Sequence, residues 1–320
     1  MNGLLLLSAA LYLGVHIGEP GSSPQVERYA TREAIPGGEQ DARWRGEWIL
    51  LRRIEPTAGT VTIGNPDAPK GAQDEARHVR LTRPYYIAVF ETTREQLRLM
   101  TGTGDGGNLP ALRVSYNDLR GSVAQGIDWP RSGHKVAPGS ILASLRAKTG
   151  LDFDLPTEAQ WEVACRAGTT TPWNDGSPLS AYERPMTEKG IPLWSDRALD
   201  RLGRYYANGG ADEGPAPVGS YPPNAWGLYD MHGNANEYCL DWYQKAGDPA
   251  YAGDDPQGPL ASSSRTRVIR SGGYWNYLFG AASACTSSAR SLGDMCLPST
   301  RHVAIGFRLS VEESQERLSK

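Results

Sequence analysis

The sequence predicts an α+β protein with a single domain over residues 46–312. Glycine and proline supply 37 and 23 of the 320 residues, which favours many turns and short elements over long helices. Three short segments carry helix-capping signals, and several short runs have the residue pattern of strands. This mixture of short helices, short strands and long irregular loops is typical of an α+β domain.

The first 45 residues are predicted to lie outside the domain. Residues 4–15, LLLLSAALYLGV, are apolar but too few to span a bilayer, and the run resembles the hydrophobic region of a secretory signal peptide. Because no Lys or Arg precedes the run, a buried N-terminal segment stays open as the alternative. We expect a signal peptide at residues 1–22, a polar linker at 23–45, export to the periplasm or extracellular space, and no membrane span.

Strands are expected where apolar residues recur between turn signals. Residues 59–65, GTVTIGN, alternate Val61 and Ile63 with threonine, and residues 78–93 form a second strand pattern broken by Pro84. Further along the chain, RVIRSGGYW at 267–275 and AIGFRLSV at 304–311 have the best strand patterns.

Helices are expected where a capping residue precedes an apolar run that ends at glycine. These start and stop pairs are Thr93 and Gly102, Ser140 and Gly150, and Thr157 and Gly168. Gln96 and Gln160 complete capping boxes in the first and third helix. Residues 313–320 are read as a tail.

Charge and cysteine content limit the function. The net charge of −3 gives no reason to expect nucleic acid as a partner. No CxxC motif is present, so a zinc knuckle is unsupported. Two alternatives stay open for the four cysteines: one or two disulfides in an exported protein, or buried free thiols. They are Cys165, Cys239, Cys285 and Cys296.

Several blocks resemble one known family. LPTEAQWEVACRAGTTTPW, PVGSYPPNAWGLYDMHGNANEYCLDWY, RVIRSGGYW and IGFRLS follow one another as in the formylglycine-generating enzymes, also called sulfatase-modifying factors. The resemblance covers residues 50–310 and implies a single C-type-lectin-like domain with little regular secondary structure and long loops.

The resemblance also implies calcium on the turn DMHGNANE. Asp230 and Glu237 would give side-chain oxygens, and Gly233 and Ala235 would give carbonyls. Carboxylates and carbonyls in a flexible loop are the ligands that Ca²⁺ prefers. A solvated turn is the alternative here. A second calcium set would be Asn208, Gly209 and Asp212, for which an acidic surface loop is the alternative.

The family's catalytic residues are missing from this chain. Formylglycine-generating enzymes oxidise a substrate cysteine with O₂ and a Cu(I) ion held by two cysteine thiolates, a ligand type that soft Cu(I) prefers. The matching positions here are Asn276 and Ala281, and neither side chain binds Cu(I) as a thiolate does. We therefore expect no copper and no catalytic residues.

Two functions from different classes follow. The first is a pseudoenzyme, a non-catalytic module that binds a protein, peptide or small molecule through the loops after residue 273. Its candidate ligand-binding residues are Tyr274, Trp275, Asn276, Tyr277 and Arg290. The aromatic cluster would be a recognition patch if exposed and core if buried, and Arg290 would face an anion or brace a loop through a carboxylate. The alternative function is an oxidase acting on a protein cysteine in sulfatase maturation.

Overall fold

The computed structural model describes residues 10–18, 23, 25–70, 74–184, 193–209, 213–244, 248–275, 285–287, 289–290 and 296–313. Its α-helices are α1 (Arg94–Thr101), α2 (Tyr116–Arg120), α3 (Ile141–Thr149), α4 (Glu158–Arg166) and α5 (Leu199–Leu202). Its strands are β1 (Tyr12–His16), β2 (Val26–Tyr29), β3 (Trp48–Ile54), β4 (Val61–Ile63), β5 (Arg77–Arg80), β6 (Tyr85–Ala88), β7 (Ala181–Arg184), β8 (Leu193–Asp196), β9 (Asn236–Trp242), β10 (Gly253–Asp254), β11 (Arg267–Arg270), β12 (Ile305–Gly306) and β13 (Ser310–Glu312).

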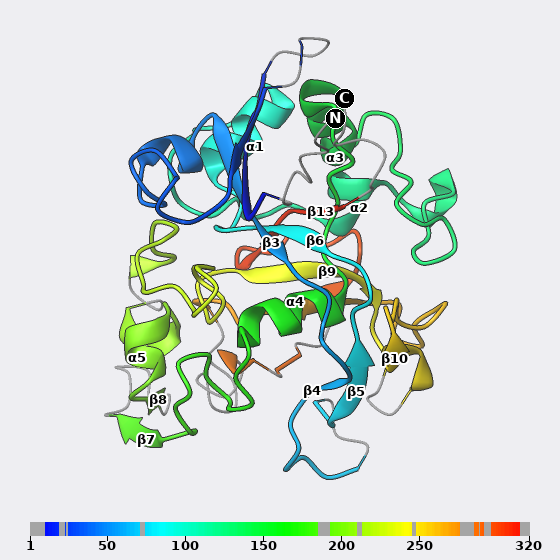
Figure 1. The fold of residues 1–320 in the computed structure, drawn as a ribbon. Helices are drawn as coiled ribbons and strands as arrows, with labels where there is room; N and C mark the ends of the chain where they lie inside the picture. The colour runs from blue at the N-terminus through cyan, green and yellow to red at the C-terminus, as the bar shows by residue number, and fades with distance from the viewer. Residues whose placement is uncertain are drawn as a thin grey trace, which may run out of the picture.

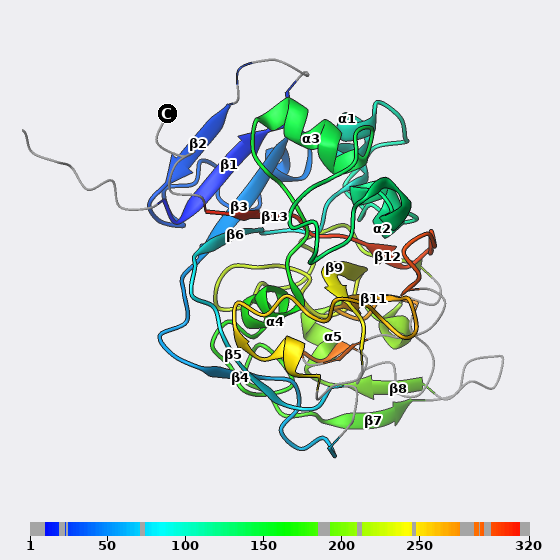
Figure 2. The same ribbon diagram turned by 90° about the vertical axis from the view of Figure 1, so that its right-hand side faces the viewer.

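The elements form an α+β fold, as predicted. A five-stranded sheet in the order β13-β6-β3-β1-β2 occupies one half of the molecule, with α1, α2 and α3 beside it. The other half holds the sheets β10-β5-β4, β11-β9-β12 and β7-β8, together with α4 and α5 (Figures 1 and 2). In the described part of the chain, no helix has both the length and the apolar character needed to cross a membrane.

The end of the apolar run, from Tyr12 onward, is part of the sheet, whereas residues 1–9 of the segment predicted as a signal peptide (residues 1–22) lie outside the described residues. Strand β1 pairs antiparallel with β2 on one side and with β3 on the other. Tyr12, Leu13 and Val15 are all buried. A strand buried on both faces has a continuous apolar sequence, so composition alone does not separate it from a signal peptide.

The predicted linker at 23–45 is likewise structured in its described residues. Val26–Tyr29 forms the edge strand β2, and Ala42–Arg45 forms a 3₁₀ helix. Trp44 in that helix is buried and its indole donates a hydrogen bond to the carbonyl of Gly38 at 2.9 Å. The polar, glycine-rich residues therefore surround one anchoring tryptophan instead of forming a free linker.

The predicted helix caps are confirmed. Thr93 and Thr157 form capping boxes, and Ser140 accepts from the backbone of Ala143. Helix α4 ends one residue earlier than predicted, because Ala167 adopts the left-handed conformation at the C-cap with φ 46°. The core lies on both faces of the five-stranded sheet. One face packs against α4 and the other against α3.

The C-terminal strand pattern divides between two sheets. Residues 305–306 form β12, which pairs parallel with β9, and residues 310–312 form β13, which pairs antiparallel with β6. Strand β9 was not predicted. All seven of its residues are buried, including Asn236, Glu237 and Asp241, so it has no polar–apolar alternation to mark it.

Candidate functional site

The turn that the sequence analysis singled out, residues 230–235, leads directly into β9 and is buried. Asp230 and Asn234 have left-handed backbones, with φ 56° and 57°. Gly233 has φ 79°, and a Cβ atom there would lie 2.1 Å from the carbonyl oxygen of Arg204. Glycine is therefore required at this position by both its backbone angle and its neighbour.

Glu237, the second predicted calcium ligand, forms an internal ion pair. Its Oε1 accepts from Arg308 at 2.8 Å, and its Oε2 accepts from the Trp161 indole at 2.6 Å. Glu237 and Arg308 are both fully buried. Arg308 also donates to the carbonyls of Ala88, Val89 and Tyr229, so it joins β6, β9 and the segment before β13.

Two further buried carboxyl groups lie in this region. Glu91 accepts from the backbone N–H of Ala235 at 2.8 Å and from the side chain of Asn234. Burial raises its pKa well above the usual range, and the nearby carboxyl of Asp230 adds to the rise. Burial likewise raises the pKa of Asp230 to about 6. One Asp230 oxygen, Oδ2, accepts from Gly219 N at 2.6 Å, while Oδ1 has no hydrogen-bond partner.

These observations fit calcium only in part. Three buried carboxyl groups face one buried guanidinium, that of Arg308, and the unpartnered Asp230 oxygen is a suitable ligand for a cation. By contrast, both Glu237 oxygens are engaged, and the carbonyl of Gly233 accepts from Ser271 at 2.8 Å. Within the described residues, no three His, Cys, Asp or Glu side chains converge to hold a metal ion. Calcium at this turn stays a prediction.

In the second predicted calcium set, the described residues already contact neighbouring residues of their own loop. Asn208 Oδ1 accepts from Tyr205 N at 2.8 Å, and its backbone carbonyl accepts from Arg204 at 2.8 Å. A Cβ atom on Gly209 would lie 1.8 Å from the Arg204 guanidinium. A cation placed here would face that positive charge. Asp212 lies outside the described residues.

The four cysteines are buried and no disulfide joins them, so of the two open alternatives the structure has buried thiols. Burial raises the pKa of Cys165, Cys285 and Cys296 to about 12 and that of Cys239 well above its usual value. At neutral pH these groups are therefore thiols and not the thiolates that bind soft metals or attack substrates. The two family catalytic positions, Asn276 and Ala281, lie outside the described residues.

The predicted ligand residues divide between surface and interior. Trp275 is 42% exposed, whereas Tyr274 is buried and donates its hydroxyl to the carbonyl of Val303 at 3.2 Å. The Trp275 ring meets both Tyr274 and Tyr206 edge to face, with centroids 6.2 Å apart in each pair. We call these three rings, Tyr206, Tyr274 and Trp275, the aromatic patch. Asn276 and Tyr277 lie outside the described residues.

Arg290 lies in the interior, as the bracing interpretation predicts and the anion-binding interpretation does not. Its Nε lies 2.6 Å from Glu158 Oε1, and its Nη2 donates to Oε2 at 3.0 Å. The guanidinium stacks 4.4 Å from the centroid of the Tyr251 ring. With its charge balanced and its side chain buried, Arg290 is not available to a ligand.

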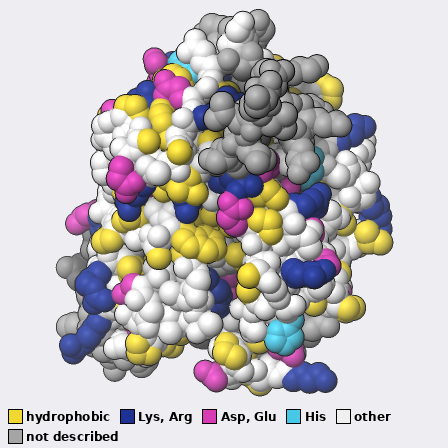
Figure 3. Space-filling model, in the orientation of Figure 1, with side chains coloured by type: hydrophobic (Ala, Val, Ile, Leu, Met, Phe, Trp, Pro, Cys, Tyr) yellow, Lys and Arg dark blue, Asp and Glu magenta, His cyan; other side chains and the backbone are white. Residues whose placement is uncertain are grey.

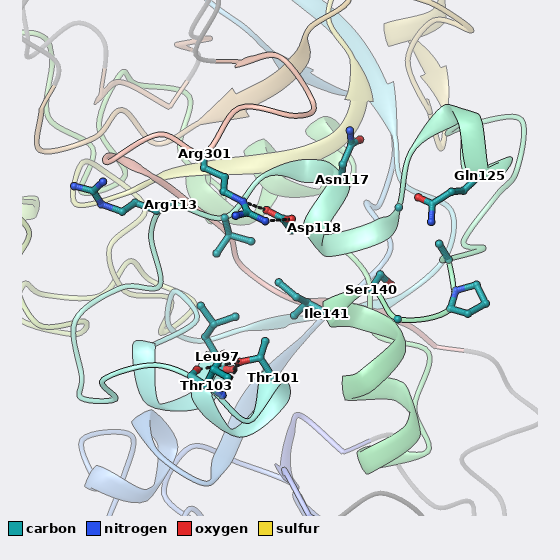
Figure 4. Close-up of a pocket in the computed structure, with 15 residues that line it drawn as sticks. Leu97, Thr101, Thr103, Arg113, Asn117, Asp118, Gln125, Ser140, Ile141 and Arg301 are labelled. Atoms are coloured by element: carbon teal, nitrogen blue, oxygen red, sulfur yellow. Dashed lines mark hydrogen bonds and ion pairs between the residues drawn. The ribbon is translucent and has the colours of Figure 1, made fainter.

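A polar groove of about 500 Å³ lies beside the aromatic patch, between the ends of α1, α2 and α3. Figure 4 shows Arg301 turned toward Asp118, with which it forms an ion pair at 2.6 Å, while Arg113 extends away from that pair. The backbone N–H of Arg113 donates to the carbonyl of His302. Residues 301–303 therefore connect this groove, which we call the α1–α3 groove, to Tyr274.

Arg113 was missed by the sequence analysis. Its side chain is exposed and has no hydrogen bond or ion pair within the described residues, and its backbone is left-handed with φ 59°. The positive charge of Arg113 opposes the rise that burial produces in the pKa of Tyr274, so Arg113 interacts electrostatically with the aromatic patch. A non-glycine residue in the left-handed region has no reliable signature in a single sequence.

Comparison with known proteins gives consistent matches over most of the chain. The model of the sulfatase-modifying factor enzyme 1-like domain matches residues 52–313. A formylglycine-generating enzyme from Mus musculus is 27% identical over 327 residues, covering 87% of this chain and 82% of the relative. The serine/threonine-protein kinase pkn1 of Chlamydia pneumoniae is 36% identical over 268 residues, 80% of this chain but 37% of the relative.

Two solved structures share the fold. PvdO from Pseudomonas aeruginosa superposes with a TM-score of 0.58 at 22% identity, covering 82% of this chain and 94% of that one. Treponema denticola variable protein 1 superposes with a TM-score of 0.57 at 21% identity, covering 83% of this chain and 96% of that one. At these identities the likeness concerns the fold alone.

Proposed function

The chain belongs to the family of sulfatase-modifying factor enzyme 1-like domains, and we propose that this member is a non-catalytic module that binds another protein. The observation that carries the proposal is Trp275, a large apolar side chain that is 42% exposed on a folded surface. Tryptophan, tyrosine and arginine dominate the energetic centres of protein interfaces. The aromatic patch and Arg113 bring these three residue types together.

The geometry of the patch supports binding. The hydroxyl of Tyr274 is held by the carbonyl of Val303, and the Tyr206 and Tyr274 rings pack against Trp275. The indole is therefore supported by two rings and loses less side-chain freedom on binding than an unsupported one. A rigid aromatic anchor next to one exposed positive charge suits a protein surface with an apolar pocket and an acidic rim.

The thiol chemistry supports the non-catalytic part of the proposal. Asn276 and Ala281 replace the cysteines expected from the family resemblance. The four cysteines present are buried thiols with raised pKa values, so none offers a thiolate at the surface near neutral pH. A chain of this family without thiolate donors keeps the scaffold and lacks the ligands for Cu(I).

A binding experiment with a matched control tests the protein-binding part. The wild-type chain, Trp275→Ala and Leu260→Ala are immobilised and exposed to proteins from cells that produce the chain. Leu260 is 57% exposed and lies outside the patch, so it controls for loss of any exposed apolar side chain. We expect a partner whose dissociation constant rises about thirtyfold with Trp275→Ala and stays unchanged with Leu260→Ala. Equal binding by all three chains would overturn the proposal.

The second candidate, an oxidase of protein cysteine, is favoured by the relatives named formylglycine-generating enzyme. Incubating the chain with a Cys-x-Pro-x-Arg peptide, Cu(I) and O₂ separates the two candidates. We expect the peptide mass to stay unchanged. The mass loss that accompanies conversion of the cysteine to an aldehyde would establish the oxidase and end the non-catalytic proposal.

Export is kept as a proposal. Its support in the sequence was the apolar run at residues 4–15, and the end of that run forms β1 in the structure, so export needs independent support. Fractionation of producing cells, followed by sequencing of the chain's N-terminus, tests it. Recovery of the chain with the cytoplasmic fraction would remove export from the proposal.

A further inference from the structure

A second groove, also of about 500 Å³, lies on the face where β3 runs past α4 toward β4 (Figure 1). Its walls come from the end of β3, the edge strand β4, the C-terminal end of α4 and Trp226. Figure 3, in the same orientation, shows hydrophobic side chains gathered near the middle of this face with charged side chains around them. We call this the β3–β4 groove. It shares no residue with the aromatic patch or the α1–α3 groove.

The walls of the β3–β4 groove are apolar and preformed. Ile54, Val61, Val163 and Trp226 line it. Val61 and Trp226 are only partly buried and pack against the main core, so their remaining apolar surface faces the groove. The volume falls within the roughly 300–1,000 Å³ typical of small-molecule sites.

The wall that carries Trp226 is fixed to α4 by Asn224. The Trp226 backbone N–H donates to Asn224 Oδ1 at 3.0 Å. The same side chain donates through Nδ2 to the carbonyls of Ala164 and Cys165, at 2.8 Å and 3.1 Å. The Trp226 wall is thus attached to α4, the helix whose C-terminal end also lines the groove. A ligand entering it need not order the walls, which lowers the cost of binding.

One positive charge in the groove has no counter-charge among the described residues. Arg52 lines the groove, and its guanidinium carbon lies 4.9 Å from the centroid of the Tyr12 ring. Its Nε is buried without a hydrogen-bond partner, and no carboxylate pairs with it within the described residues. Burying a polar N–H of a charged group without a partner is costly, and such groups are satisfied by a ligand or by water.

The other arginines of the groove are already paired. Arg53 binds Glu313 at 2.8 Å and also contacts Glu55. Arg166 binds Glu162 at 2.8 Å. Arg52 is therefore the guanidinium that a ligand can use within the described groove, and it offers a planar fork that matches a carboxylate.

We infer that the β3–β4 groove binds an amphipathic monocarboxylate, a medium-chain fatty acid, with its carboxylate on Arg52 and its aliphatic chain against Val61, Val163 and Trp226. One unpaired charge among the described residues of the groove matches a monoanion, whereas a phosphate ester would need further cations or donors. The apolar walls match an alkyl chain, whose burial drives binding in proportion to its area. This inference is independent of the protein-binding proposal, because the two sites share no residue.

Decanoate and decanol, which differ in the carboxylate, test the inference by calorimetry on the full chain. We expect decanoate to bind the wild type more tightly than decanol does. Arg52→Gln should weaken decanoate binding about tenfold or more and change decanol binding by less than about twofold. Arg83→Gln is the matched control, because Arg83 is an exposed arginine outside the groove. Retained decanol binding also shows that the Arg52→Gln chain is folded.

A second measurement needs no variant. Nuclear Overhauser effects between the methylene protons of bound decanoate and the Trp226 indole are expected in the wild type. The inference is overturned if decanoate does not bind below its micellar range, if it binds without contact to Trp226, or if decanoate and decanol bind equally well.

Discussion

The buried carboxylate of Glu162 gives the sharpest test of how the interior is held together. It is fully buried on α4, and Oε1 accepts from Gly64 N at 2.6 Å and from Arg166 Nε at 2.9 Å. Oε2 is bound by Arg270 of β11. Burial alone would raise its pKa, but the guanidinium groups of Arg270 and Arg166 outweigh burial and hold the pKa at about 2.

The perturbation is Glu162→Gln, which keeps the shape and removes the charge. At pH 7 the carboxylate is ionised in both the folded and the unfolded chain. A pKa lowered from 4.5 to about 2 therefore contributes about 3 kcal/mol to the free energy of unfolding. Removing Glu162 also leaves Arg270 with only its longer ion pair, to Glu158 at 3.4 Å, and breaking one partner of a buried pair costs about 3–5 kcal/mol when no other counter-charge remains, which is an upper bound here.

The pH dependence follows from the direction of the pKa shift. Between pH 4.5 and 2 the unfolded chain takes up a proton at Glu162 that the folded chain does not, so this stabilisation falls as the pH falls. Urea unfolding followed by tryptophan fluorescence measures it. The difference in unfolding free energy between wild type and Glu162→Gln should shrink by about 2 kcal/mol from pH 7 to pH 3.

Glu55→Gln is the matched control, because Glu55 pairs with an arginine while its side chain is 64% exposed. An exposed pair contributes about 0–1 kcal/mol, so this variant should follow the wild type at every pH. The reasoning is refuted if the Glu162→Gln difference stays constant from pH 7 to pH 3, or if it is no larger than that of Glu55→Gln.

Three further predictions concern the buried turn and strand β9. Gly233→Ala should lower the unfolding free energy by about 2 kcal/mol or more beyond the loss caused by Gly253→Ala. Both glycines have positive φ, but a Cβ atom at Gly253 meets nothing within 4 Å; equal losses would contradict the steric argument. Burial raises the pKa of Asp241 to about 7, so from pH 4 to 7 the unfolded chain loses the Asp241 proton before the folded chain does, and the wild type becomes less stable. Asp241→Asn does not titrate, so its urea midpoint should rise relative to that of the wild type over the same range. Calcium should raise the melting temperature above that measured with chelator, because the ion would offset the surplus negative charge of the buried carboxylates. Asp230→Asn should abolish the rise. If calcium does not shift the melting temperature of the wild type, the calcium prediction is wrong.

The helices were predictable because their signals are local. Thr93, Ser140 and Thr157 each satisfy backbone donors within three residues, so the sequence around each cap carries its own explanation. Local strand patterns also predicted β4 and β11, although the pattern at 304–311 gave two strands on different sheets.

Strands β1 and β9 could not be predicted because what stabilises them is distant in sequence. The apolar β1 is explained only by its pairing with β2 and β3. Glu237 can lie inside β9 only because Arg308, 71 residues further along the chain, neutralises it. A single sequence reveals neither partner, so a polar residue in β9 indicates a turn when read alone.

The candidate site shows the same division. Trp275 could be named from its sequence, since aromatic residues on a loop suggest recognition, but whether it is exposed depends on the fold. Arginine is a residue type that binds anions, but the Arg290 guanidinium pairs with Glu158 in the interior. Arg113 gave no sequence signal, because its position near Tyr274 depends on residues 301–303, which are hydrogen-bonded to both.

The C-terminal arginines are buried in ion pairs or against aromatic rings, which limits what the proposed binding surface can use. Arg270, Arg290 and Arg308 each pair with a buried glutamate, and the guanidinium carbon of Arg267 lies 3.4 Å from the Trp242 ring centroid. Their charges hold irregular loops to the framework, where a core of short elements offers little backbone pairing. That role removes them from solvent, so the proposed recognition at the aromatic patch would rest on the exposed Trp275 indole, with Arg113 as the nearby exposed charge that would set orientation.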